Sequence, residues 1–346
     1  MDAPAWRILA CCSGVGAEHR RRGAPGQDSV AQWTGRSRDG EPVWVLALAD
    51  GHGHRRHWLS AVGSAEACRV ALLTLSRWLA GLELRGAGPT TLGAWQRQLA
   101  MGLARRIHGR WLAAARRHWR QAGAAAAGPL APFGAEPYGC TLAVLVLTPR
   151  WWAVSGLGDW DLVGLDRHGD AVLLSEERPL DPDREITASL CQFDAAAVMA
   201  ARTQLRSLAA AAPIALLLSS DGVRKSCGAT ADYLAWAAAL VARLPDSQLA
   251  PQLEQLSHRG TGDDVSVLAV SHGQVTWPPG PATVSPPRQR LPRGRRPADR
   301  RPRGWWSGRP VRWLLAHRRI TMASVLLLAA LLLIPALVGL LRLLGG

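Results

Sequence analysis

Five aspartates stand in glycine-bearing turns at the ends of predicted strands. They are Asp28 in GAPGQDSV, Asp50 in ALADGHG, Asp159 in SGLGDWD, Asp221 in LLSSDGV and Asp263 in GTGDDVSVLAV. A strand that ends in a carboxylate holds a metal ligand rigidly, and a neighbouring glycine lets a backbone carbonyl approach the same ion. Each turn alone is more often a plain turn than a ligand, but together they predict a carboxylate cluster.

Such a cluster suits hard divalent cations such as Mg²⁺ and Mn²⁺, which prefer oxygen ligands. The aspartates would repel one another severely unless cations neutralised them. Two cations about 3.5–4 Å apart can bridge a water molecule, lower its pKa and direct it at an electrophilic phosphorus. The sequence has no Cys-x5-Arg loop for a route through phosphocysteine.

The elements that must position these aspartates alternate between strand-like and helical patterns. Strands are predicted at 42–50, 141–149, 151–158, 161–167, 171–176, 214–221 and 265–271. Short turns join several of them, which favours antiparallel pairing. Helices are predicted at about 58–85, 91–121, 194–212, 230–243 and 246–258. This order predicts an α+β layered sandwich. Tryptophans at helical spacing are expected in the core or in packing between helices, namely Trp78, Trp95, Trp111 and Trp119. His108 and His118 are expected on solvated faces.

The order of the acidic motifs resembles the metal-dependent Ser/Thr protein phosphatases of type 2C. The matching motifs are Gln27-Asp28, Asp50-Gly51-His52-Gly53, Gly139-Cys140-Thr141, Gly158-Asp159, Ser220-Asp221-Gly222 and Asp263-Asp264-Val265-Ser266. The resemblance covers roughly residues 13–271. The segment GAEHRRRGAPGQDSV is similar to a bacterial subgroup with a histidine before Gln-Asp, so His19 lies either near the site or on a solvated loop.

The resemblance implies a four-layer sandwich of two antiparallel β-sheets flanked by antiparallel helix pairs. It also implies hydrolysis of phosphoserine and phosphothreonine on proteins that a Ser/Thr kinase has phosphorylated. Asp50 would bridge two Mn²⁺ or Mg²⁺ ions, with the carbonyl of Gly51 on one of them. Asp221 and Asp263 would complete the ligand shell of the other ion. Asp28 would orient the bound water, His52 would protonate the leaving oxygen, and Asp159 would belong to a weaker third metal site.

One departure concerns the arginine that family members place shortly before the first acidic motif to hold the phosphate. Here Gly23 and Ala24 occupy that neighbourhood, and the run of three arginines from Arg20 to Arg22 comes slightly too early. This leaves a second hypothesis open, in which the chain is a catalytically weak or inactive phosphatase-fold module, tethered to the membrane for binding or regulation. Retention of the aspartates favours the enzyme.

The charge of the chain is concentrated at its C-terminal end. Residues 273–346 hold 13 arginines and one acidic residue, Asp299, so they carry +12 of the net +15. The nearly neutral remainder argues against a nucleic-acid-binding domain, which would need a basic face of its own. The six cysteines form no CxxC pair, which favours a reducing compartment.

A transmembrane helix is predicted at residues 320–341, where 22 residues carry no charge. At about 1.5 Å per residue this length crosses a hydrocarbon core of about 30 Å. Arginines are more frequent before this helix than after it, which predicts a single-pass protein of the cytoplasmic membrane with its N-terminal domain in the cytoplasm. The expected organisation is a phosphatase-like domain at 1–272, a disordered basic linker rich in Pro and Arg at 273–319, and the membrane helix.

Overall fold

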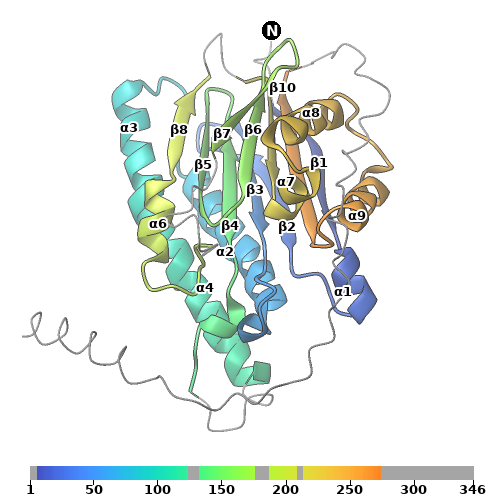
Figure 1. Ribbon diagram of the computed structural model, residues 1–346. Helices are drawn as coiled ribbons and strands as arrows, with labels where there is room; N and C mark the ends of the chain where they lie inside the picture. Colours follow the sequence, from blue (N-terminus) through green and yellow to red (C-terminus); the bar gives the residue numbers. More distant parts are fainter. Residues whose placement is uncertain (1–5, 124–131, 176–186, 209–212, 274–346) are drawn as a thin grey trace, which may run out of the picture. The chain divides into compact units, whose positions relative to one another are not determined.

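Two antiparallel sheets of five strands each form the centre of the fold in the computed structural model (Figure 1). The structure describes residues 6–123, 132–175, 187–208 and 213–273, and all of them lie in one unit, Met1–Gln289. The first sheet has the order β1 (Trp6–Gly14), β10 (Val265–His272), β9 (Ala215–Ser219), β6 (Asp161–Leu165) and β7 (Ala171–Ser175). The second has the order β2 (Ser29–Arg36), β3 (Pro42–Ala49), β4 (Leu142–Leu147), β5 (Trp151–Leu157) and β8 (Gln204–Ser207).

Helices cover the outer face of each sheet. The second sheet carries α2 (Ser60–Ala80), α3 (Pro89–Arg97), α4 (Ala104–His118) and α6 (Ala195–Ala201). The first sheet carries α7 (Asp221–Cys227), α8 (Thr230–Val241) and α9 (Leu249–Arg259). Short segments complete the described elements, namely α1 (Ala17–Arg22), the 3₁₀ turns Arg55–His57 and Glu136–Tyr138, and the π-helical turns Gln98–Leu103 and Trp119–Gly123. Figure 1 shows α3, α4 and α6 on one side of the strands and α7, α8 and α9 on the other.

The alternation of side chains along the strands produces three apolar layers. In β3, Val45 and Ala47 pack against the helices, whereas Leu46 and Leu48 face the other sheet. In β9, Leu217 faces the helices of its own sheet. Because successive residues of a strand point to opposite faces, a strand buried on both faces reads as an uninterrupted apolar run. The predicted α+β sandwich of two antiparallel sheets between helices is therefore confirmed.

The structure also corrects several sequence-based expectations. The predicted helix at 194–212 is wrong over residues 202–208, because α6 ends at Ala201 and Gln204–Ser207 forms strand β8 beside β5. Edge pairing supplies backbone hydrogen bonds there, so it outweighs the local helical composition. Residues 209–212 of this prediction lie outside the described residues. Strands β1 and β2 were not predicted. His108 is buried, with its Nε2 3.1 Å from the carbonyl oxygen of Leu190, whereas the four tryptophans lie in the core as predicted.

The described helices include none that is both long and apolar enough to cross a bilayer. The predicted basic linker at 273–319 and the predicted transmembrane helix at 320–341 lie outside the described residues.

Candidate active site at the ends of the strands

The predicted aspartates converge on one cleft of about 870 Å³. Asp50 directly follows β3, Asp159 follows β5, Asp221 begins α7 just after β9, and Asp263 comes just before β10. These four line the cleft. Asp28, which comes just before β2, is not among the lining residues, but its charge contributes to the raised pKa of Asp50. Two adjacent sheets thus deliver their strand ends to the same place, which the order of the motifs along the chain could not show by itself.

The Gly-x-Thr motif fixes the position of Asp50. The backbone amide of Asp50 donates to Thr141 Oγ1 at 2.9 Å, and the amide of Thr141 donates to the carbonyl of Asp50 at 2.8 Å. A Cβ atom on Gly51 would lie 2.7 Å from the carbonyl oxygen of Gln27. Since no other residue fits at this approach, Gly51 brings its backbone close to the loop that carries Asp28.

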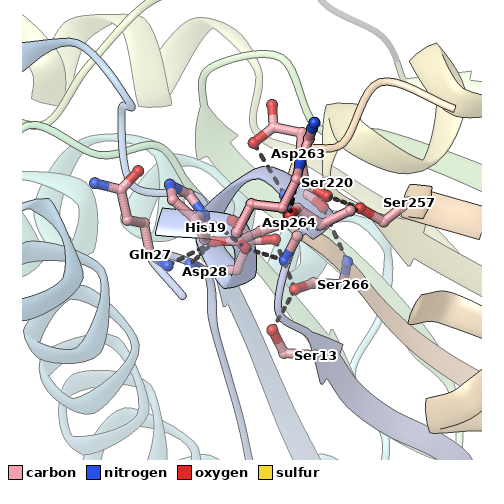
Figure 2. A network of polar contacts seen from close by, with 12 residues as sticks. Ser13, His19, Gln27, Asp28, Ser220, Ser257, Asp263, Asp264 and Ser266 are labelled. Atoms are coloured by element: carbon pink, nitrogen blue, oxygen red, sulfur yellow. Dashed lines mark hydrogen bonds and ion pairs between the residues drawn. The ribbon is translucent and has the colours of Figure 1, made fainter. Parts of the chain in front are cut away.

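Asp264 anchors that loop, and sequence reasoning assigned it no role. This side chain is buried, and its Oδ1 accepts from the amide of Gly16 at 2.5 Å and lies 2.9 Å from His19 Nδ1. Its Oδ2 accepts from the amides of Gln27 at 2.5 Å and Asp28 at 3.3 Å. Figure 2 shows these groups converging on Asp264. His19 therefore lies near the site, which was one of the two positions predicted for it. It contacts Asp264, which holds the Asp28 loop, and it does not line the cleft.

Several buried side-chain oxygens of the aspartate cluster and the loop before β2 have no hydrogen-bond partner. They are Asp28 Oδ1, Asp221 Oδ1 and Gln27 Oε1. A buried carboxylate oxygen without a donor is costly, so it is normally matched by a cation or an ordered water. Asp28 is half satisfied, because its Oδ2 accepts from the Ser266 hydroxyl at 2.7 Å. Cation binding would give these lone pairs a partner, which is the fit that hard divalent ions require.

No three His, Cys, Asp or Glu side chains in the described ranges are gathered as a complete metal site. Mg²⁺ is commonly held by one or two carboxylates together with waters and carbonyls.

The crowding of carboxylates raises the affinity of the cluster for protons. Burial, followed by the charge of neighbouring carboxylates, raises the pKa of Asp159 to about 7 and the pKa of Asp50 well above its usual range. Burial also raises the pKa of Asp28, to about 8, against the opposing hydrogen bond from Ser266. Asp263 is exposed at the rim, yet loss of solvent and then the charge of Asp221 still raise its pKa. Divalent cations would compete with these protons.

Asp221 behaves differently because a lysine lies beside it. Burial acts to raise the pKa of Asp221, but the Lys225 ammonium, through its charge and its hydrogen bond, outweighs burial and holds this pKa below its usual value. The Nζ atom of Lys225 is 2.5 Å from Asp221 Oδ2. The pKa of Asp221 thus shifts in the opposite direction to the pKa values of Asp50 and Asp159.

His52 follows Gly51 and lines the same cleft. Its ring lies 5.0 Å from the ring of His57, measured between centroids. Burial, and then the charge of His57, lower the pKa of His52 to about 4. A Cβ atom on Gly139 would collide with His57, so the glycine of the Gly-x-Thr motif leaves room for both rings. At neutral pH His52 thus enters the cleft as an uncharged imidazole.

The arginines before the first acidic motif are engaged away from the cleft. Arg20 pairs with Glu254, and Arg21 and Arg22 pair with Glu18. The basic residues that line the cleft are Arg224 and Lys225, which sequence reasoning missed. The available signal was their position, one helical turn beyond the Asp221-Gly222 motif.

Two packed antiparallel sheets with an aspartate-lined cleft at their strand ends agree with the phosphatase architecture that the motifs implied. The sequence matches a family model described as protein phosphatase 2C over residues 15–257. Because this match spans more than half of the chain, the chain belongs to the protein phosphatase 2C family. By that membership it is a protein Ser/Thr phosphatase.

Several solved structures are similar to this chain at low identity. A bacterial serine phosphatase is 16% identical with a TM-score of 0.47, over 78% of this chain and 98% of that one. A serine/threonine phosphatase from S. agalactiae is 18% identical with a TM-score of 0.46, over 77% and 99%. The phosphatase PstP/Ppp from Mycobacterium tuberculosis is 18% identical with a TM-score of 0.45, over 78% and 100%. No curated protein matches the sequence. Because these values are low, the family assignment rests on the family model.

Proposed function

We propose that the chain hydrolyses phosphoserine and phosphothreonine on proteins at a dinuclear Mn²⁺ or Mg²⁺ site in the aspartate cleft. The observation that carries this proposal is the convergence of carboxylates whose buried oxygens, on Asp28 and Asp221, lack hydrogen-bond donors. When bound, the two cations supply an activated water and neutralise charge on the phosphoryl group. The proposed ligands are Asp28, Asp50, the Gly51 carbonyl, Asp221 and Asp263.

Three aspartates have separate proposed roles in the reaction. Asp50 lines the cleft, and its backbone hydrogen bonds with Thr141 hold it there, so its carboxylate would help to hold the cations. Asp28 would orient the attacking water through its unpaired Oδ1. Asp264 holds the Asp28 loop in register with β10.

His52 is the proposed proton donor to the leaving serine or threonine oxygen. As an uncharged imidazole it can donate one N–H hydrogen bond, and the negative charge of a bound phosphate ester favours its protonated form. The charge of Asp221 already acts in that direction.

The test is hydrolysis by the full-length protein in detergent, with p-nitrophenyl phosphate and a phosphothreonine peptide as substrates and Mn²⁺ as the metal. Asp50→Asn and Asp263→Asn should each reduce hydrolysis by about 100-fold or more. Asp170→Asn, in the exposed turn between β6 and β7, is the matched control and should retain activity. A wild-type protein without activity, or undiminished activity in both cleft variants, would refute the proposal.

The second candidate is a phosphatase-fold module with weak or no activity that binds phosphoproteins at the membrane. One observation favours it, because Arg20, Arg21 and Arg22 are paired with glutamates and do not reach the cleft. In this case the phosphothreonine peptide should bind to the Mn²⁺-loaded protein without being hydrolysed.

We also propose that residues 320–341 anchor the protein in the cytoplasmic membrane, with residues 1–272 in the cytoplasm and 273–319 as a basic tether. The uncharged run and the excess of arginine before it support this topology. Its substrates would then be proteins phosphorylated by a cytoplasmic Ser/Thr kinase. Protease added outside intact cells should leave the N-terminal domain uncut, and digestion would overturn the topology.

A further inference from the structure

Lys225 is the only lysine in the sequence, in which all other Lys or Arg positions are arginine. It lies on α7, one turn after Asp221, and lines the aspartate cleft. Its Nζ is 2.5 Å from Asp221 Oδ2 and 3.9 Å from Asp159 Oδ2. The only ammonium group among the side chains therefore stands between two of the carboxylates that were expected to bind metal.

The shape of the lysine head group suits this position. An ammonium is a compact point charge with three rotatable donors, whereas a guanidinium is a planar fork whose donors have fixed directions. Arg224, the neighbouring residue, shows the contrast, because its guanidinium is held by Asp161 at 3.0 Å and Thr230 at 3.1 Å.

The two oxygens of Asp221 have different partners. Oδ2 accepts from the Lys225 ammonium, while Oδ1 is buried and has no hydrogen-bond partner. Asp159 has a second contact, because its Oδ2 accepts from the Thr187 hydroxyl at 2.9 Å. The contacts with Lys225 and Thr187 thus use the Oδ2 atom of each carboxylate.

We propose that the Lys225 ammonium is an internal cation that takes the place of a third divalent ion between Asp159 and Asp221. The inference rests on the proposed metal-dependent function and sharpens it, because the site then takes two ions and Asp159 becomes a positioning residue for Lys225. It replaces the sequence-based expectation that Asp159 belongs to a weak third metal site.

The test counts metal ions and does not depend on activity. Full-length protein in detergent is equilibrated with a saturating concentration of free Mn²⁺, and bound Mn²⁺ per chain is measured by elemental analysis. The wild type should bind two ions. Lys225→Met, which keeps the length of the side chain and removes its charge, should bind one more. Lys225→Arg, which keeps the charge, should bind two, and Lys225→Asp, which adds a carboxylate, should bind the extra ion more tightly than Lys225→Met does.

A double variant identifies the place of the extra ion. If that ion sits between Asp159 and Asp221, then Asp159→Asn in the Lys225→Met background should return the count to two. Circular dichroism should first establish that each variant is folded, and Lys225→Gln serves as the neutral replacement if Lys225→Met is not.

Three results would overturn the inference. A wild type that binds three ions leaves no place for an internal cation. Neutral variants that bind two ions show that Lys225 does not exclude a third. A neutral variant with two ions but weaker inhibition by inorganic phosphate would instead make Lys225 a phosphate-binding group. By contrast, a wild type that binds no Mn²⁺ and hydrolyses no substrate refutes the proposed function itself.

Discussion

The anchoring of the Asp28 loop by Asp264 makes a sharp prediction about Asp264→Asn. In the wild type both carboxylate oxygens accept backbone N–H groups, from Gly16 on one side and from Gln27 and Asp28 on the other. An asparagine must turn its NH₂ group toward one of these sides. Whichever way it turns, at least one buried N–H loses its acceptor.

The expected loss in the free energy of unfolding follows from the number of buried N–H groups that lose their acceptor. A buried donor left without an acceptor costs about 1–3 kcal/mol, so Asp264→Asn should lower the free energy of unfolding by about this amount. Asp264→Ala removes all the partners of the loop and leaves a buried cavity, so it should cost about 3–5 kcal/mol. In both variants the Asp28 loop loses its anchor, and Mn²⁺ affinity should fall as well.

The assay is urea unfolding followed by circular dichroism, in a chelator so that bound metal does not contribute. Asp263→Asn is the matched control. Its side chain is exposed, and its one backbone contact, from the Asp264 amide at 2.9 Å, can be kept by an amide oxygen. The control should unfold within about 0.5 kcal/mol of the wild type while binding Mn²⁺ less tightly. If Asp264→Asn unfolds at the same urea concentration as the wild type, the anchoring role is refuted.

Three further predictions follow from the cleft. The pKa values of Asp28, about 8, and Asp159, about 7, are raised, so chelator-treated protein is stabilised by the protonated carboxyls below about pH 4 and loses this stability as the pH rises toward 8. The melting temperature should therefore fall across this pH range in chelator and recover when Mn²⁺ is added. A melting temperature that does not change with pH in chelator would contradict the crowding of these carboxylates. His52→Gln should reduce hydrolysis of a phosphoserine peptide by about 10²–10⁴-fold more than hydrolysis of p-nitrophenyl phosphate, because the serine oxygen is the poorer leaving group and needs a proton. Equal losses in kcat for the two substrates would show that His52 is not the proton donor. Gly51→Ala should weaken Mn²⁺ binding measured by calorimetry, since its Cβ would press on the loop that carries Asp28, whereas Gly88→Ala, whose Cβ would enter open space, should not.

The sequence predicted the strands that are buried on both faces and bounded by turns. Strand β3 is an example, because its unbroken apolar run allows few other structures. Strand β1 was missed because its sequence, WRILACCSG, owes its place to pairing with β10, more than 250 residues later. Strand β8 was missed for a similar reason, since only the open edge of β5 defines it.

Some residues of the candidate site could be predicted from a local sequence pattern and others could not. Asp50 could be found from its motif, because a strand followed by Asp-Gly is a local pattern. The roles of Asp264 and Lys225 depend on which backbone groups and carboxylates lie next to them, and those come from distant parts of the chain. The spacing within α7 places Lys225 on the same face as Asp221, but it does not show that Asp159 lies there as well.

The central claim, that the aspartate cleft holds the cations that catalyse phosphate ester hydrolysis, is tested most directly by one titration. Mn²⁺ is added to chelator-treated full-length protein, and bound Mn²⁺ per chain and phosphate release from a phosphothreonine peptide are measured in the same samples. The account predicts that no hydrolysis occurs without metal and that the rate rises as the second ion binds. Full activity before any Mn²⁺ is bound, or no activity once two ions are bound, would contradict it.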